Sequence, residues 1–241
     1  MRVVSLVPSA TETLIALGVT PIACTRFCEQ PDIAVVGGTK DPDVAAIVAL
    51  RPDLVVVNDE ENRYADAAAL TDAGVAVYSM SPRSVEDVGE SVVDLAQRVG
   101  TSVPGQFTPD AWHAWLTAIL TPRWYEAFVA VWRRPWMSLA SDTYGSSLLD
   151  LLGVGNVFAG AVERYPEVTL EEVAALAPNL VVLPSEPYPF AERHVTEVAR
   201  TVPGVPTVLV DGRDLFWWGF RTPEAAERLR DALPGLGSSG R

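Results

Sequence analysis

The stretch VAAIVALRPDLVVV, residues 44 to 57, decides the fold of this chain. Its first half places apolar residues at helical spacing, a proline-containing turn follows, and the closing run from Leu54 to Val57 is typical of a buried parallel strand. The stretch LEEVAALAPNLVVL, residues 170 to 183, superposes on it without a gap. A helix–turn–strand unit that occurs twice in one chain predicts two similar α/β lobes with parallel sheets.

A second, shorter echo supports a duplication. The stretches from Leu14 to Val19 and from Leu149 to Val154 both end in Leu-Gly-Val, and the two echoes occur in the same order along the chain. The longer repeat also places Glu60 opposite Glu186. Because open parallel sheets bind ligands beyond the carboxyl ends of their strands, we expect these glutamates at equivalent strand ends, on facing rims of one interlobe cleft.

Helices and strands alternate along the rest of the chain. A strand is predicted at residues 2–7, and Ser9 to Glu12 has the pattern of a capping box that begins a helix. Glycines and prolines at residues 100–109 indicate a boundary between lobes. We therefore expect an N-terminal α/β lobe over residues 1–104, a linker helix within residues 105–125 and a C-terminal α/β lobe over residues 126–241.

Charge and hydropathy exclude several classes of protein. The chain has 31 acidic and 18 basic residues, and such a negative charge repels phosphate backbones, so nucleic acid is not expected as a partner. No apolar run approaches the roughly 20 residues of a membrane-spanning helix, and Pro8 interrupts the first apolar run before a signal peptide could form. We expect no membrane insertion and a cytoplasmic location for the chain as written. A periplasmic or extracellular location is expected only if a signal has been removed.

Aromatic residues gather in predicted loops of the C-terminal half. Aromatic side chains that follow strand ends, among prolines and glycines, are typical of a wall that faces a ligand. Trp217 and Trp218, which follow a predicted strand at residues 207–210, fit this description best. The expected ligand-binding residues are Trp132, Trp136, Tyr188, Phe190, Phe216, Trp217 and Trp218 from the loops, with Asn58, Glu60 and Glu186 from the strand ends.

Metal ligation would require Cys, His or carboxylate side chains from several segments. The candidate metal ligands are Cys28, Glu61 and His194, with Glu60 and Glu186 nearby in the predicted loops. Cys24 and Cys28 have a C-x3-C spacing, which fits neither a redox motif nor a zinc finger, so two buried thiols are expected. The chain contains no nucleophile elbow and no phosphate-binding loop, so no catalytic residue is assigned.

Three stretches of the chain resemble a known family. The opening RVVSLVPSATE at residues 2–12, the phrase LRPDLVV at residues 50–56 and its echo at residues 171–183 resemble the cobalamin and iron-siderophore receptors of ABC importers. These receptors form the helical-backbone metal-receptor superfamily, which has a periplasmic-binding-protein-like fold. The resemblance implies two Rossmann-like lobes joined by a backbone helix, a ligand in the cleft between them, and an ABC-importer permease as partner.

A narrower resemblance is to a cobalamin-receptor-like subgroup that lacks a signal peptide. It rests on five short motifs: Arg26-Phe27-Cys28, Gly37-Gly38-Thr39-Lys40, Glu60-Glu61-Asn62, Asp142-Thr143-Tyr144 and the run from Pro184 to Phe190. It predicts a solute-binding protein without enzymatic activity, whose ligand is a corrinoid such as cobalamin or a metal chelate such as a ferric siderophore. The alternative is a cytosolic metal-dependent enzyme or metal-handling protein that reuses the fold around a Cys/Glu/His centre.

Overall fold

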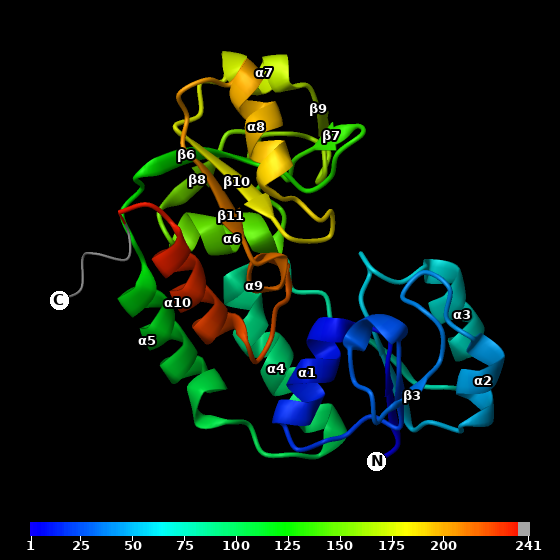
Figure 1. Cartoon of the computed structure of the whole chain (residues 1–241). Helices are drawn as coiled ribbons and strands as arrows, with labels where there is room; N and C mark the ends of the chain where they lie inside the picture. Colours follow the sequence, from blue (N-terminus) through cyan, green and yellow to red (C-terminus); the bar gives the residue numbers. More distant parts are fainter. Residues whose placement is uncertain (236–241) are drawn as a thin grey trace. The chain divides into compact units, whose positions relative to one another are not determined.

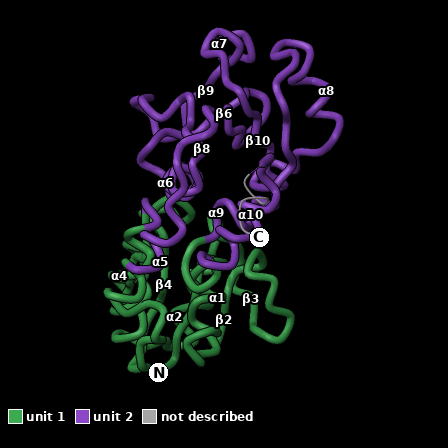
Figure 2. Tube along the Cα trace, turned by 90° about the vertical axis from the view of Figure 1, so that its left-hand side faces the viewer, with its two compact units in different colours: residues 1–82, 86–113, 218–221 green, residues 83–85, 114–217, 222–241 purple. Residues whose placement is uncertain are grey.

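The computed structural model describes residues 1–235 and divides the chain into two compact units (Figures 1 and 2). The first unit comprises residues 1–82, 86–113 and 218–221, and the second comprises residues 83–85, 114–217 and those from 222 onward. Residues 218–221 therefore belong to the first unit although both of their flanks belong to the second. The lobe boundaries expected from the sequence, at residues 104 and 126, divide the chain without this return.

The first unit contains a sheet of five parallel strands in the order β3-β2-β1-β4-β5. Val4 at its centre pairs with Ala23 on one side and Val55 on the other. Its strands are β1 (Val3–Ser5), β2 (Ala23–Cys24), β3 (Ala34–Val35), β4 (Leu54–Val57) and β5 (Val77–Ser79), and its helical segments are α1 (Pro8–Ala16), η1 (Arg26–Cys28), α2 (Val44–Ala49), α3 (Tyr64–Asp72), α4 (Val85–Val99) and η2 (Gly105–Phe107).

The second unit contains a sheet of four parallel strands in the order β11-β10-β6-β8 and a small antiparallel pair, β7 with β9. Helix α5 begins in the first unit and ends in the second, within the range expected for the linker helix. The strands are β6 (Tyr125–Val129), β7 (Trp136–Met137), β8 (Val154–Asn156), β9 (Glu167–Val168), β10 (Leu180–Pro184) and β11 (Thr207–Val210), and the helices are α5 (Pro109–Ile119), α6 (Tyr144–Leu151), α7 (Leu170–Ala175), α8 (Glu192–Thr201), α9 (Gly212–Phe216) and α10 (Thr222–Ala232).

The two sheets repeat one topology. The order β2-β1-β4-β5 in the first unit matches β8-β6-β10-β11 in the second, with α1, α2 and α3 at the chain positions of α6, α7 and α8. The prediction of an α/β fold with two similar parallel-sheet units is confirmed.

The repeat extends to backbone detail. Arg51 and Ala177, at matching positions before the two prolines, both have φ of 49°. Gly18 and Gly153, which close α1 and α6, have φ of 80° and 79°. Asp43 and Thr169 both cap their helices, since each side chain accepts a backbone N–H three residues ahead. The sequence echo therefore reflects two copies of one local structure.

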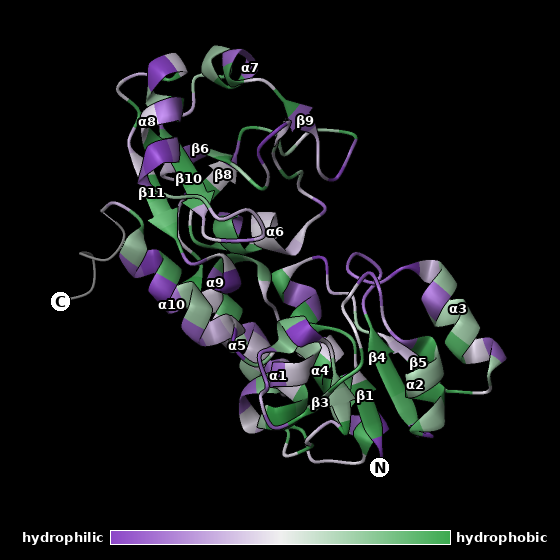
Figure 3. Ribbon diagram, turned by 45° about the vertical axis from the view of Figure 1, so that its right-hand side comes forward, coloured by the Kyte–Doolittle hydropathy of each residue, from purple (hydrophilic) through white to green (hydrophobic). Residues whose placement is uncertain are grey.

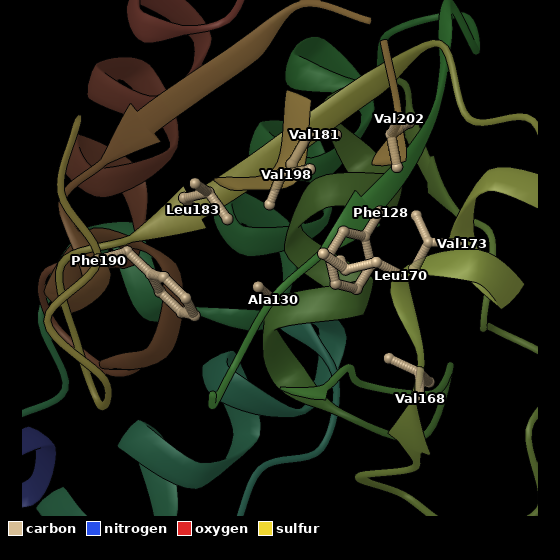
Figure 4. Close-up of a cluster of buried hydrophobic side chains, with 10 residues drawn as sticks. All are labelled: Phe128, Ala130, Val168, Leu170, Val173, Val181, Leu183, Phe190, Val198 and Val202. Carbon is tan, nitrogen blue, oxygen red and sulfur yellow. The ribbon is translucent and has the colours of Figure 1, made fainter. Parts of the chain in front are cut away.

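Apolar strands form the core of each unit (Figure 3). In the second unit, residues of β6 and β10 pack against α7 and α8 (Figure 4), because buried parallel strands carry apolar side chains toward both faces of the sheet. Phe190, which lies beyond the end of β10, belongs to the same cluster. This burial fixes the loop that follows β10.

The start of α1 differs from the sequence-based expectation. The helix begins at Pro8, with Val7 at the N-cap and no side-chain cap, so Ser9 to Glu12 is not a capping box. Proline is favoured at the first helical position, where its fixed φ suits the helix and no N–H is required. The hydroxyl groups of Thr11 and Thr13 instead donate to the carbonyl oxygens of Val7 and Ser9, one turn earlier.

No helix within residues 1–235 is both long enough and apolar enough to cross a bilayer.

Candidate functional site

Two buried asparagines organise the carboxyl end of the first sheet. The Asn58 Oδ1 atom, just beyond β4, accepts the backbone N–H groups of Glu60 and Glu61, and its Nδ2 donates to the Met80 carbonyl oxygen. The side chain of Asn58 is therefore occupied within the protein. This residue, expected to contact ligand, positions the loop that bears Glu60 and Glu61.

Asn62 connects this loop to two other strand ends. Its Oδ1 accepts the backbone N–H of Asn58 at 2.8 Å, and its Nδ2 donates to the carbonyl oxygens of Leu6 at 3.2 Å and Thr39 at 2.9 Å. Leu6 follows β1, and Thr39 lies in the loop between β3 and α2. One amide thus joins three segments at the edge where parallel sheets bind ligands.

An aromatic cluster lies at the carboxyl end of the second sheet. Trp132 follows β6, and Tyr188 and Phe190 follow β10, while Trp136 lies in β7. Trp136 stacks on Phe190 with ring centroids 5.6 Å apart, and Trp132 meets Tyr188 edge-on at 5.5 Å. The structure therefore brings together four of the seven aromatic residues expected in the ligand wall. Trp132 is 42% exposed and is the most exposed residue of the four.

Polar side chains lie beside the aromatic cluster and hold its surroundings in place. Arg133 binds both carboxylate oxygens of Glu197 on α8, at 2.9 and 2.8 Å. His194 lies against Tyr188 and Phe190, each with ring centroids 5.4 Å from its own. Its Nδ1 accepts the backbone N–H of Ala191 at the start of α8. His194 is therefore a residue of the aromatic packing and of the helix start.

The remaining expected ligand contacts are more dispersed. Trp218 is only 5% exposed and belongs to the first unit, whereas Trp217 and Phe216 are half-buried and belong to the second. The Arg213 guanidinium lies over the Trp217 ring, 5.5 Å from its centroid. Burial leaves Trp218 little surface for a ligand, and contact between Trp217 and a ligand stays a prediction.

Glu60 and Glu186 lie beyond β4 and β10, two strands that occupy equivalent positions in the two sheet orders. The equivalence that the repeat predicted is thus present. That the two glutamates line one interlobe cleft stays a prediction.

Comparisons with known proteins identify the family. The profile of the periplasmic binding protein family matches residues 3–186 of the chain. The chain belongs to this family. The vitamin B12-binding protein of Vibrio parahaemolyticus is 27% identical over 203 residues, which cover 80% of this chain and 71% of the relative.

Solved structures of this family share the fold. The periplasmic vitamin B12 binding protein BtuF of Vibrio cholerae superposes with a TM-score of 0.80 and 20% identity, over 98% of each chain. The periplasmic heme binding protein HutB of Vibrio cholerae superposes with a TM-score of 0.76 and 19% identity, over 95% of this chain and 97% of the other. Periplasmic binding proteins bind small molecules and deliver them to ABC transporters, so membership supports a binding function and not the enzyme alternative.

The candidate metal ligands form no metal site within residues 1–235. Within the part of the chain that the structure describes, no three His, Cys, Asp or Glu side chains are placed to hold a metal ion, and Cys28, Glu61 and His194 form no such group. Burial, together with the charges of Arg193 and Arg133, lowers the pKa of His194. His194 and Cys28 belong to different units.

The two cysteines are free, buried thiols, as the sequence predicted. The Cys28 sulfur lies 3.2 Å from the Thr11 hydroxyl and 3.3 Å from the Thr25 hydroxyl. Burial raises the pKa of Cys24 to about 12, and the neighbouring Cys28 adds to the shift. Because the thiolate is the form that reacts and binds metal, Cys24 is poorly suited to either role at neutral pH.

We therefore expect Cys24 to resist alkylation in the native protein. At pH 8 a thiol with this pKa reacts with iodoacetamide about a thousandfold more slowly than a free cysteine, because so little thiolate is present. Labelling of the Cys28→Ser variant, followed by mass spectrometry with and without urea, isolates Cys24. Rapid labelling of native wild-type protein that added zinc suppresses would instead support a metal centre.

Proposed function

We propose that this protein binds a corrinoid of the cobalamin type and delivers it to the permease of an ABC importer. The observation that carries the proposal is the aromatic cluster beyond the strands of the second unit, in which the exposed ring of Trp132 is supported by Tyr188, Trp136 and the buried Phe190. Rigid aromatic rings give a flat macrocycle a large contact area with little loss of side-chain entropy. The vitamin B12-binding protein of Vibrio parahaemolyticus, among the curated relatives, supports the same class of ligand.

The charge at the first unit's strand end favours a corrinoid over heme. Asp59, Glu60 and Glu61 follow one another at this edge. Carboxylates accept hydrogen bonds from the neutral carboxamides around a corrin ring. Beside these three acids, among the residues that the structure describes, the edge has one ammonium without a carboxylate partner, that of Lys40, which can neutralise one anionic group but not both propionates of heme.

The histidine beside the aromatic cluster gives a second reason. A histidine side chain is one of the common protein ligands of heme iron. His194 is 1% exposed, and its Nδ1 already accepts a backbone N–H. A corrinoid needs no such ligand, because the nitrogens of its ring and its own axial ligands complete the coordination of its cobalt.

Equilibrium dialysis against cyanocobalamin, hemin and a ferric siderophore tests the proposal. Each ligand absorbs visible light, so the amount retained by the protein is measured directly. Retention of cyanocobalamin in a one-to-one complex is expected. Retention of hemin or of the ferric chelate, with no retention of cyanocobalamin, would overturn the proposal.

The Trp132→Ala variant is expected to bind cyanocobalamin about tenfold more weakly, which corresponds to about 1.4 kcal/mol. The loss follows from removing an exposed ring at the carboxyl end of β6. Trp124→Ala is the matched control, because Trp124 is 64% exposed and precedes the amino end of the same strand. Titration calorimetry of both variants measures the difference. Equal affinities in the two variants would remove the aromatic cluster from the binding site.

A further inference from the structure

Lys40 is the only lysine among the 241 residues, whose other basic side chains, apart from two histidines, are arginines. It lies in the loop between β3 and α2, at the same edge of the first sheet as Asn58 and Asn62. Its ammonium Nζ donates to the backbone carbonyl oxygen of Glu60 at 2.6 Å. The single lysine is thus attached to the loop that follows β4.

The loop that carries Lys40 is held in place from three directions. The Asn62 amide donates to the Thr39 carbonyl, next to Lys40. The Arg26 guanidinium binds the Asp41 carboxylate, with a shortest distance of 2.9 Å. Gly37 has φ of 93°, and its backbone pairs with Pro42 across the loop. Such fixation reduces the conformational entropy that the loop would lose when a ligand binds.

The ammonium of Lys40 is the cation at this edge whose charge is not matched by a carboxylate. Arg26 pairs with Asp41, and Arg63 pairs with Asp66. Across residues 1–235, no Asp or Glu oxygen lies within ion-pair distance of Lys40, whose partner is a neutral carbonyl. An ammonium group has three donors. One is used by Glu60, which leaves two for oxygens of a ligand.

We propose that Lys40 binds an anionic oxygen group of the ligand, the phosphodiester in the nucleotide arm of a complete corrinoid. This inference rests on the proposed corrinoid-binding function and names the part of the ligand that the first unit recognises. A compact ammonium suits a single phosphodiester, whose two free oxygens can share its two remaining donors. The acids at residues 59–61 are acceptors suited to the neutral carboxamides of the same ligand.

A purely structural role of Lys40 makes a different prediction. If the ammonium only holds its loop to Glu60, its loss weakens every corrinoid to the same extent. If it binds the phosphodiester, its loss weakens only corrinoids that possess one. Cyanocobalamin and dicyanocobinamide distinguish the two cases, because dicyanocobinamide lacks the nucleotide arm and its phosphodiester.

The test is titration calorimetry of both ligands with wild-type protein and Lys40→Gln, a variant that keeps a donor for Glu60 but loses the charge. We expect about tenfold weaker binding of cyanocobalamin and less than about twofold change for dicyanocobinamide, a charge-assisted hydrogen bond being lost in the first case alone. Asp41→Asn is the control for the loop, because it weakens the contact with Arg26 and leaves Lys40 in place. It should affect both ligands equally.

The outcomes separate the two proposals. Wild-type protein that binds neither corrinoid overturns the proposed function and this inference together. Wild-type protein that binds both ligands, with Lys40→Gln weakening both equally or neither, overturns the inference and leaves the function standing.

Chemical labelling of the wild-type chain provides a readout independent of any variant. Because Lys40 is the sole lysine, an amine-reactive ester labels only this side chain and the N-terminal amine. Cyanocobalamin should slow labelling of Lys40 severalfold, dicyanocobinamide should not, and the N-terminal amine serves as internal reference. Equal labelling of Lys40 with both ligands would contradict direct contact with the phosphodiester.

Discussion

The Gly153→Ala variant is expected to lose about 3 kcal/mol or more of unfolding free energy, whereas Gly18→Ala loses about 1 kcal/mol. Both glycines close equivalent helices with nearly the same φ, 79° and 80°, so the backbone strain of an alanine is equal at the two sites. The surroundings differ. A Cβ atom at Gly153 would overlap the Pro122 carbonyl oxygen, while a Cβ atom at Gly18 meets nothing within 4 Å.

The segment around Pro122 has little freedom to move away. The Thr121 N–H donates to the Leu151 carbonyl at 3.0 Å, and the Trp124 N–H donates to the Gly153 carbonyl at 2.8 Å. Urea denaturation followed by circular dichroism measures both variants, and the slope of the transition shows whether the two units unfold together. Equal losses in the two variants would show that the Pro122 segment yields to the added methyl group.

The Asn62→Leu variant is expected to lose about 3 kcal/mol of stability, because leucine has no polar atom to replace the amide. The Asn58 N–H and the carbonyl oxygens of Leu6 and Thr39 would lose their partner, and each buried polar group left without a hydrogen bond costs about 1–3 kcal/mol. The first unit should unfold at lower temperature, and the loop bearing Lys40 should lose one of its three attachments.

Tyr64→Ala is the control for Asn62→Leu. Tyr64 is two residues away at the start of α3, and its side chain is exposed, so a change within about 0.5 kcal/mol is expected. Thermal unfolding of both variants, with hydrogen exchange at the residues from Gly37 to Pro42, measures the effect. An Asn62→Leu variant as stable as Tyr64→Ala, with unchanged exchange in this loop, would contradict the role assigned to the amide.

Local patterns predicted the architecture because the determining interactions lie within short stretches of chain. The repeat of residues 44–57 at 170–183 specifies a capped helix, a left-handed turn residue and a buried strand, all of which depend on near neighbours. The aromatic cluster was also partly predictable. Trp132, Tyr188 and Phe190 follow strands that end at one edge of a sheet, so their grouping follows from topology.

Other features depend on contacts that no local pattern contains. Asn62 binds Leu6 across 56 residues and Thr39 across 23, and these pairings arise only when strand order is known. The one available signal was that Lys40 and Asn62 both fall within the motifs of the subgroup resemblance. Trp218, expected to contact a ligand, is buried in the structure, because an aromatic residue in a glycine-containing loop can be buried as readily as exposed.

The return of residues 218–221 to the first unit has a consequence for synthesis on the ribosome. Phe220 packs on Phe107 at 5.3 Å, its N–H donates to the Thr13 hydroxyl, and Arg221 lies 3.6 Å from the Glu12 carboxylate. These partners emerge more than a hundred residues before Phe220 does. During translation the core of the N-terminal unit therefore stays incomplete until most of the polypeptide has left the exit tunnel. A nascent chain arrested before residue 218 should be more sensitive to protease at Phe107 than the released protein.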